Sequence, residues 1–557
     1  MKNAMLWAGK RMRRRLPSLA AMTLAHVGQA LLGVGFALGT RMVIDSAVGG
    51  DSDAFFRACL VQGGIIAGLL LCQLLYRQLH ELLSAKLDRD WKQSLLHSLL
   101  GSEYSAVKAF HSGELLNRMN NDVRILNRGL LEALPNLAAL LTRLVAATAV
   151  LVSLEPWFAL AVCAAGAVVI LTTGLIRRSM KKLHRQVSEQ EGRVSGFMQE
   201  VLEKLLMVQA MDASEEMERR ADALLADRYA VQRKRKNLAL VSNTCVSVLH
   251  QGASFAALLW CGYKLLQGRL SFGSLTAVIQ LVNQIQAPIM NLSAVIPQYI
   301  AMSAAAERLR EICELEPEIP LLDRTREELY EKLNAIRAEE LSFAYDRELL
   351  MDRVSLELKK GSFTVITGSS GIGKSTLLKL LLGVCRPDSG ELYLDLGVER
   401  IRVDRSVRRL FAYVPQGNLL LSGTLRENLL IANPNAGEAE LRQAVFVSAM
   451  DEFLPQLPQG LDTLIGESGA GLSEGQAQRL AIARAILGGA PILLLDECTS
   501  ALDEGTERLV LKRIRELKDR TCIAVTHRPA ALDLCDLQLE MQGRNLYLKP
   551  CCKEHLK

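Results

Sequence analysis

The chain has 557 residues, of which 50% are hydrophobic and 23% are charged, and its mean hydropathy is +0.16. A disordered chain is excluded because it would be polar and charge-biased, and a positive mean hydropathy indicates membrane spans. The net charge of +6 fits a basic cytosolic face, so no nucleic-acid partner is expected. The 12 Cys include no CxxC pair, which argues against a zinc site or a disulfide framework.

Six helical membrane spans are predicted within residues 1–306. Five apolar runs contain no Asp, Glu, Lys or Arg, and a sixth, Leu130–Leu154, is interrupted by Glu132 and Arg143. Each run is long enough to cross about 30 Å of hydrocarbon as a helix. The uninterrupted runs are Leu16–Thr40, Ala58–Tyr76, Pro156–Ile176, Asn237–Tyr263 and Leu270–Ala306.

Basic residues predict the orientation of these spans. Residues 1–15, 77–128 and 177–236 carry 6, 8 and 14 Lys or Arg, whereas the alternate connections carry 4 in total. The positive-inside rule therefore places the N-terminus and everything after the sixth span in the cytosol. The first run is too long for a signal-peptide core, so we expect an uncleaved span and a multi-pass protein of the plasma (inner) membrane.

The second half changes character. Residues 307–337 are charged and contain Pro317 and Pro320, so they are interpreted as a linker between a transmembrane domain, 1–306, and a second domain, 338–557. β-branched runs then alternate with helical stretches, which predicts an α/β fold. The strand-like runs are FTVITG, LYLDL, FAYVP, ILLLDE and CIAVTH.

A phosphate-binding loop is predicted where FTVIT leads into GSSGIGKST and then into an apolar helix. Glycines let backbone N–H groups surround phosphate oxygens, and the helix N-terminus adds a positive dipole end. Lys374 would reach the β- and γ-phosphates and Ser375 would ligate Mg²⁺, so ATP and Mg²⁺ are the expected cofactors. The predicted nucleotide-binding residues here are Gly368, Ser369, Ser370, Gly371, Ile372, Gly373, Lys374, Ser375 and Thr376.

A pair of carboxylates follows the strand-like run ILLLDE. Acids at the carboxyl end of a parallel strand lie at the mouth of the sheet, beside the phosphate loop. Asp496 suits coordination of Mg²⁺, and Glu497 suits a base that orients the attacking water.

With these residues in place, the second half resembles the nucleotide-binding domain of an ABC transporter. LSEGQAQRLAIARAI, residues 472–486, resembles the ABC signature and keeps Ser473 and Gly475, although Glu474 stands where the family has Gly. The resemblance implies further roles: Gln416 as the Q-loop residue at the catalytic site and the metal, Ser500–Asp503 as the D-loop, His527 as the switch histidine and Tyr345 as the aromatic that stacks on adenine.

The first half resembles the transmembrane domain of ABC exporters. His111–Val123 is similar to their first cytosolic loop, and Glu467 stands in a segment similar to a loop that contacts the partner subunit. Six spans followed by one cassette correspond to a half-transporter. The resemblance therefore implies a helical six-span domain of exporter type followed by a P-loop ABC ATPase domain.

One cassette cannot complete an ABC active site, so the resemblance implies a dimer in which Ser473 and Gly475 hold the ATP bound mainly by the partner. Retention of Glu497 and His527 favours a homodimer, while a heterodimer stays open. The implied activity is ATP-driven export of an amphipathic or polar small molecule, lipid or peptide by alternating access. An importer on the exporter fold and a non-pumping channel or regulatory subunit remain alternatives, whereas a soluble ABC ATPase would lack the spans.

Polar residues inside the spans offer a clue to the substrate. Arg143, His250 and Gln284 each lie 11 or 12 residues inside the outer end of their run, about 16–18 Å deep. Arg143 has no acidic residue at a similar depth, so it faces a wet cavity, bonds to Gln, His or backbone carbonyls, or receives an anionic group from outside the chain. The last span carries a polar stripe that lines the pathway or bonds to neighbouring helices: Gln280, Gln284, Asn291 and Gln298.

Overall fold

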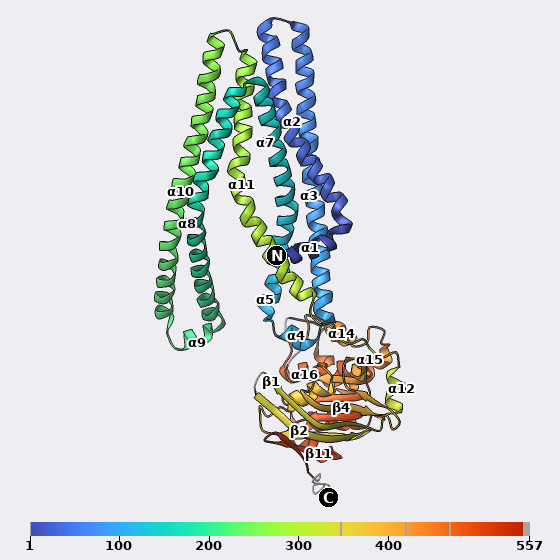
Figure 1. The fold of residues 1–557 in the computed structure, drawn as a ribbon. Helices are drawn as coiled ribbons and strands as arrows, with labels where there is room; N and C mark the ends of the chain where they lie inside the picture. Colours follow the sequence, from blue (N-terminus) through green and yellow to red (C-terminus); the bar gives the residue numbers. More distant parts are fainter. Residues whose placement is uncertain are drawn as a thin grey trace. The chain divides into compact units, whose positions relative to one another are not determined.

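The computed structural model describes residues 2–345, 348–417, 420–466, 469, 471–517 and 519–549, without the side chains of residues 2, 167–178, 181, 246, 250 and 287–297. The chain forms two compact units, one of residues 1–98 and 111–314, the other of residues 99–110 and 315–557 (Figure 1).

The first unit consists of long helices joined by short turns (Figure 1). Its long helices are α2 (Leu16–Gly49), α3 (Ser52–Gly101), α7 (Leu134–Leu154), α8 (Pro156–Glu203), α10 (Ser214–Leu266) and α11 (Phe272–Cys313). Its short helices are α1 (Lys2–Arg11), α5 (Ser112–Asn117), α6 (Val123–Arg128) and α9 (Leu205–Ala210), with single π-helical turns at Arg118–Asp122 and Gly129–Ala133.

Small and aliphatic residues hold these helices together. Helices α2, α7 and α11 pack against one another, and α8 packs along α10. Ala37, Ala147 and Ala257 have no exposed surface, so backbones approach closely at these positions, as is usual for membrane helices. Leu151 and Leu281 fill the same cluster.

Four helical stretches in the described part of the chain are long and apolar enough to cross a membrane. They correspond to the first, second, third and fifth predicted spans. The predicted spans Pro156–Ile176 and Leu270–Ala306 fall in α8 and α11, where the side chains of residues 167–178 and 287–297 lie outside the described residues. The four stretches are Asn3–Gly49, Ser52–Gly101, Ser112–Leu154 and Ser214–Leu266.

Helices α8 and α10 run side by side and are joined at one end by α9 (Figure 1). This tip carries large apolar side chains that are exposed: Leu206 is 82% exposed and Met211 is 69% exposed, with Leu205 and Met207 beside them. An apolar helical tip of this kind is unusual on a solvated surface.

The second unit is built on two sheets. A six-stranded sheet has the order β12-β11-β3-β10-β9-β6, and a four-stranded antiparallel sheet has the order β2-β1-β4-β5. The strands of the first are β3 (Phe363–Gly368), β6 (Phe411–Val414), β9 (Ile492–Asp496), β10 (Thr521–Val525), β11 (Leu537–Gln542) and β12 (Asn545–Lys549); those of the second are β1 (Ala335–Tyr345), β2 (Glu348–Lys359), β4 (Ser389–Asp395) and β5 (Arg400–Arg402).

Four neighbouring strands of the larger sheet, β3, β10, β9 and β6, are parallel. Strands β9 and β10 are buried along their whole length and β3 along all but its last residue, which explains their continuous apolar sequences, whereas β6 at the edge is half-buried. The helices of this unit cover the sheets: α12 (Arg326–Glu331), α13 (Lys374–Leu381), α14 (Leu425–Leu430), α15 (Glu438–Val447), α16 (Glu474–Leu487), α17 (Glu504–Arg515) and α18 (Pro529–Leu534). A two-stranded ribbon pairs β7 (Gly423–Thr424) with β8 (Leu464–Ile465).

A segment far away in the sequence also belongs to this unit. Residues 99–110 contain the short helix α4 (Tyr104–Lys108) and pack with residues 315–557. Their backbone is joined to the linker, because the Glu103 N–H donates to Glu316 O (3.1 Å) and the Glu318 N–H donates to Gly101 O (2.8 Å).

Candidate active site

The strand order of the larger sheet gathers the predicted catalytic segments at one edge. Val525 of β10 pairs with Ile366 of β3 on one side and with Asp496 of β9 on the other, and Val414 of β6 pairs with Leu495 of β9. These strands are parallel, so the loops that follow them all leave from the same edge.

The phosphate loop runs from the end of β3 into α13. Gly371 and Gly373 have φ of +80° and +110°, values that favour glycine and let successive N–H groups turn inward. Lys374 is buried, and its Nζ donates to Gly368 O (2.7 Å) and Ser369 O (2.9 Å). The side chain of Lys374 is therefore held against the backbone of the phosphate loop.

Asp496 anchors the centre of the site. Its side chain is buried, and its two oxygens accept hydrogen bonds from Ser375 Oγ and from Tyr413 Oη, each at 3.0 Å. Burial, followed by the charge of Asp496, raises the pKa of Tyr413, so this phenol stays a neutral donor. Sequence reasoning missed Tyr413, since only the pairing of β6 with β9 brings it to the carboxylate.

Glu497 is held from two directions. Its N–H donates to Val525 O (2.9 Å), and Gln416 Nε2 donates to its Oε2 (2.7 Å). Its φ of +47° lies in the left-handed region, which is strained for a residue with a side chain and recurs at functional sites. His527 is exposed and lies two residues after the end of β10, at the same sheet edge.

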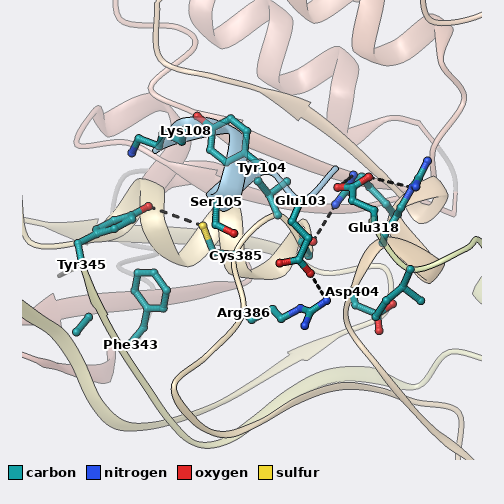
Figure 2. A pocket seen from close by; sticks show the side chains of 16 residues that line it. Glu103, Tyr104, Ser105, Lys108, Glu318, Phe343, Tyr345, Cys385, Arg386 and Asp404 are labelled. Carbon is teal, nitrogen blue, oxygen red and sulfur yellow. Dashed lines mark hydrogen bonds and ion pairs between the residues drawn. The ribbon is translucent and has the colours of Figure 1, made fainter. Parts of the chain in front are cut away.

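Tyr345 ends β1, in the other sheet, and reaches the phosphate loop. Its hydroxyl lies 3.8 Å from Cys385 Sγ (Figure 2). The hydroxyl also hydrogen-bonds with Thr376, the last residue of the loop. Burial, reinforced by Cys385, raises the pKa of Tyr345 to about 12. The tyrosine is therefore a neutral ring beside a pocket of about 260 Å³.

Ser473 and Gly475, the predicted signature residues, lie at the start of α16. Ser473 caps this helix, because its Oγ accepts from the Gln476 N–H (3.3 Å) while Gln476 Oε1 accepts from the Ser473 N–H (2.9 Å). A Cβ at position 475 would lie 3.0 Å from Ala501 O, so glycine allows close packing there. Among the described contacts, these two residues are not joined to the phosphate loop.

The segment Ser500–Asp503 is held by side-chain hydrogen bonds that the sequence did not predict. Arg528 donates to Leu502 O (2.6 Å), Ser500 O and the buried carboxylate of Glu507 (3.1 Å). Gln478 of α16 donates to Ser500 Oγ (3.0 Å). The segment between β9 and α17 is thus tied to the helix of Ser473 and to the residue after His527.

The polar residues of the transmembrane helices divide into two kinds. Gln284 Nε2 donates to Gly33 O (2.8 Å), so this glutamine joins α11 to α2. Arg143 is half-buried on α7, and within the described part of the chain its guanidinium makes no hydrogen bond or ion pair. The side chains of His250 and Asn291 lie outside the described residues.

His26 of α2 makes both a ring contact and polar contacts. Its ring stacks on Tyr76 with 4.5 Å between the centroids. His26 Nδ1 lies 3.3 Å from Gln29 Oε1, and the ring also hydrogen-bonds with Asn136.

Comparison with known proteins identifies both halves. The family described as the ABC transporter transmembrane region matches residues 19–289, and the ABC transporter family matches residues 351–500. The uncharacterized ABC transporter ATP-binding protein YwjA of Bacillus subtilis (strain 168) is 29% identical over 83% of this chain and 82% of its own length. The mitochondrial potassium channel ATP-binding subunit of Xenopus tropicalis is 30% identical over 84% of this chain and 68% of its own length.

A solved structure of a bacterial Atm1-family ABC exporter with ATP bound has the same fold, with a TM-score of 0.78 and 24% identity over 96% of this chain and 94% of that chain. The chain therefore belongs to the ABC transporters of exporter type: it is a membrane protein with a half-transporter layout, and it joins a helical transmembrane domain to an ATP-binding domain of the family that hydrolyses ATP coupled to transport.

Proposed function

We propose that this half-transporter exports an amphipathic or polar molecule with an anionic group, by alternating access driven by ATP hydrolysis at a dimer of cassettes. The observation that carries the proposal is the gathering of Lys374, Asp496, Glu497 and Gln416 at one sheet edge, with Ser473 bonded elsewhere. The proposed organisation is a transmembrane domain of residues 1–306, a linker of residues 307–337 and a cassette of residues 338–557.

The metal fit supports Mg²⁺. The Ser375 hydroxyl and the Asp496 carboxylate lie 3.0 Å apart, and oxygen donors of this kind suit a hard divalent cation. The side-chain amide nitrogen of Gln416 donates to Glu497, which leaves the side-chain amide oxygen of Gln416 as a third oxygen ligand for the metal. The bound metal would neutralise charge on the phosphates. Among the described residues, no group of three or more His, Cys, Asp or Glu is placed to hold a metal ion.

Each residue then has a proposed part in hydrolysis. Lys374 balances the charge of the β- and γ-phosphates, within the row of glycine N–H groups. Glu497 accepts the proton of the attacking water, and Gln416 keeps its carboxylate oriented toward that water. His527, exposed at the edge, donates to the γ-phosphate oxygens.

A second copy of the chain is the proposed partner. Ser473 and Gly475 stand at a helix N-terminus, where backbone N–H groups favour an anion, and in the proposed dimer that anion is the γ-phosphate held by the other cassette. The exposed apolar tip at Leu206 and Met211 supports a further contact with the partner. Retention of Glu497 and His527 in one chain favours a homodimer over a pair with one degenerate site.

The proposed membrane is the plasma or inner membrane, with the N-terminus and the cassette in the cytosol. The basic residues of segments 1–15, 77–128 and 177–236 support this orientation.

Arg143 supports an anionic or strongly polar substrate. It lies 11 residues inside the outer end of α7, about 16 Å deep, and no described residue pairs with it. An unpaired arginine at such a depth costs at least about 2.5–3.5 kcal/mol on insertion scales. A carboxylate or phosphate on the substrate would offset that cost through a charge-assisted hydrogen bond. His26, within reach of the charge on Arg143, adds a second polar group.

A second candidate function is a regulatory subunit of a channel. The relative from Xenopus tropicalis is named as a potassium channel ATP-binding subunit, and it matches 84% of this chain. Such a subunit would share the nucleotide site but would not move a substrate against its gradient.

The test is transport by the purified full chain in proteoliposomes. We expect ATP to drive accumulation of an acidic amphiphile in vesicles whose cassettes face outward. We also expect that compound to stimulate ATP turnover. The Glu497→Gln protein, reconstituted alongside, should accumulate none. Hydrolysis without accumulation, together with an ATP-dependent ion conductance, would support the channel function instead.

A further inference from the structure

We propose that Lys108, the last residue of α4, covers the face of the Tyr345 ring that receives adenine, so that nucleotide binding displaces Lys108 and loosens α4 from the cassette. This inference rests on the proposed adenine-stacking role of Tyr345. It adds a residue of the first cytosolic connection to the nucleotide site.

The two faces of the Tyr345 ring are differently occupied. Lys108 Nζ lies 4.9 Å from the ring centroid, and the Phe343 ring meets Tyr345 edge-to-face with centroids 5.0 Å apart and an angle of 88°. Figure 2 shows Lys108 and Phe343 on opposite sides of the ring. Phe343 is buried in the sheet core, so only the side that Lys108 overlies is open to a ligand.

Adenine and the ammonium group compete for this face. Both are attracted to the face of an aromatic ring, but an ammonium 4.9 Å above the centroid leaves no room for a base stacked at van der Waals distance. Lys108 is otherwise exposed, and no carboxylate among the described residues pairs with it. Among the described residues, the ammonium group interacts with the ring, and a bound base would remove this contact.

The opposite end of α4 is fixed independently of nucleotide. The Glu103 carboxylate pairs with Arg386, and the backbone of Gly101 accepts from the Glu318 N–H. The largely buried carboxylate of Glu318 in turn binds Arg405 (3.0 Å) and Arg408 (2.9 Å). Displacing Lys108 therefore frees only the C-terminal end of α4, and the helix pivots about its pinned end instead of detaching.

This arrangement links two events by a single equilibrium. If the Lys108 contact weakens adenine binding by some factor, bound adenine must weaken the α4 contact by the same factor. An exposed cation–π pair corresponds to a factor of about two to five in an equilibrium constant. Nucleotide occupancy would thus be reported to the first cytosolic connection before any hydrolysis takes place.

Nucleotide affinity of the full chain in lipid nanodiscs tests the proposal. Calorimetric titration with ATP in EDTA, which prevents hydrolysis, is compared with titration by inorganic tripolyphosphate, which has no base. We expect Lys108→Ala to tighten ATP binding about two- to fivefold and to leave tripolyphosphate binding no tighter. Loss of a positive charge alone would weaken the binding of both anions, so the opposite sign for ATP is diagnostic.

A matched control exists in the same unit. Lys360 Nζ lies 4.9 Å from the ring centroid of Tyr330, in the same kind of contact but away from the phosphate loop. Lys360→Ala should leave both affinities unchanged. Weaker or unaltered ATP binding in Lys108→Ala would overturn the proposal.

Tyr345→Leu separates this inference from the proposed function. If it weakens ATP binding and removes the effect of Lys108→Ala, both proposals stand. If it weakens ATP binding while Lys108→Ala has no effect, only the displacement of Lys108 is refuted. If it leaves ATP binding unchanged, adenine does not stack on Tyr345, and both the stacking role and the displacement are refuted.

Discussion

Replacing Arg528 with Met should destabilise the cassette, because it leaves a buried carboxylate without its cation. The Glu507 side chain is 1% exposed, and apart from Arg528 its carboxylate accepts a described hydrogen bond from Thr499 Oγ1 (2.8 Å). Removing one partner of a buried ion pair costs about 3–5 kcal/mol. The Arg528 side chain is 35% exposed and Glu507 lies in the first turn of α17, so water and the helix dipole reduce this to about 2–3 kcal/mol.

The loss can be followed through the buried cysteines of the cassette. Cys385, Cys498, Cys522 and Cys535 are all buried, and burial raises the pKa of the Cys498 thiol to about 12, so a thiol-reactive coumarin labels it only on unfolding. For a domain of this size a loss of about 2–3 kcal/mol lowers the melting temperature by about 4–12 °C. ATP turnover should fall as well, since Arg528 also holds the carbonyl oxygens of Ser500 and Leu502.

Two further proteins make this experiment decisive. Arg508→Met, on the exposed side of α17, removes pairs to Glu504 (3.2 Å) and Asp533 (3.4 Å) and should shift the melting temperature by no more than about 1–2 °C. Adding Glu507→Gln to Arg528→Met should recover at least half of the lost stability, because an amide costs less to bury than a carboxylate. A double variant as unstable as Arg528→Met, or an Arg528→Met protein that melts with the parent, would refute the reasoning.

Four other substitutions test the proposed transport cycle. Glu497→Gln keeps the shape and the contact with Gln416, so it should retain ATP, trap the ATP-bound dimer and lower turnover at least about a hundredfold. Ser473→Arg and Lys374→Ala should each abolish turnover, but mixed dimers should regain part of it, because both defects then fall on one composite site. Arg143→Met should preserve folding and basal ATPase while abolishing stimulation by acidic amphiphiles and sparing stimulation by neutral ones.

The first of these tests has a control variant, and all of them have a contrary outcome. The control Glu504→Gln changes an exposed carboxylate on the same cassette, and this protein should hydrolyse ATP normally. Normal turnover in the Glu497→Gln protein would exclude Glu497 from catalysis. Full activity of either single variant would contradict the composite site. An Arg143→Met protein that responds to every ligand class as the parent does would exclude the anion site.

The phosphate chemistry was predictable because it is local. Nine consecutive residues from Gly368 carry the phosphate loop, and Asp496 with Glu497 end a single apolar strand. Tyr413 and Arg528 were not predictable, because their roles depend on which strands pair and on how the segment after β9 packs. The attachment of α4 to the cassette unit could not be seen either, since nothing in its short sequence indicates a contact with residues far away in the chain.

For the polar residues of the membrane spans, the sequence predicts their depth along the helix but not their hydrogen-bond partners. Counting from the outer end placed Gln284 and Arg143 at similar levels. The structure separates them: Gln284 donates a hydrogen bond to Gly33 O, whereas Arg143 makes no hydrogen bond or ion pair among the described residues. Side-chain periodicity gives the face of a helix, but the neighbour on that face depends on tertiary packing.

Residues 99–110 are synthesised well before the part of the cassette to which they attach. Glu103 leaves the ribosome about 280 residues before its partner Arg386, and at roughly 5–20 residues per second the wait is about 15–55 s. During that interval α4 and its flanking loop stand in the cytosol without the surface that they will cover. A nascent chain stalled before β3 would therefore be open to proteases at residues 99–110, and completion of the cassette would close that window.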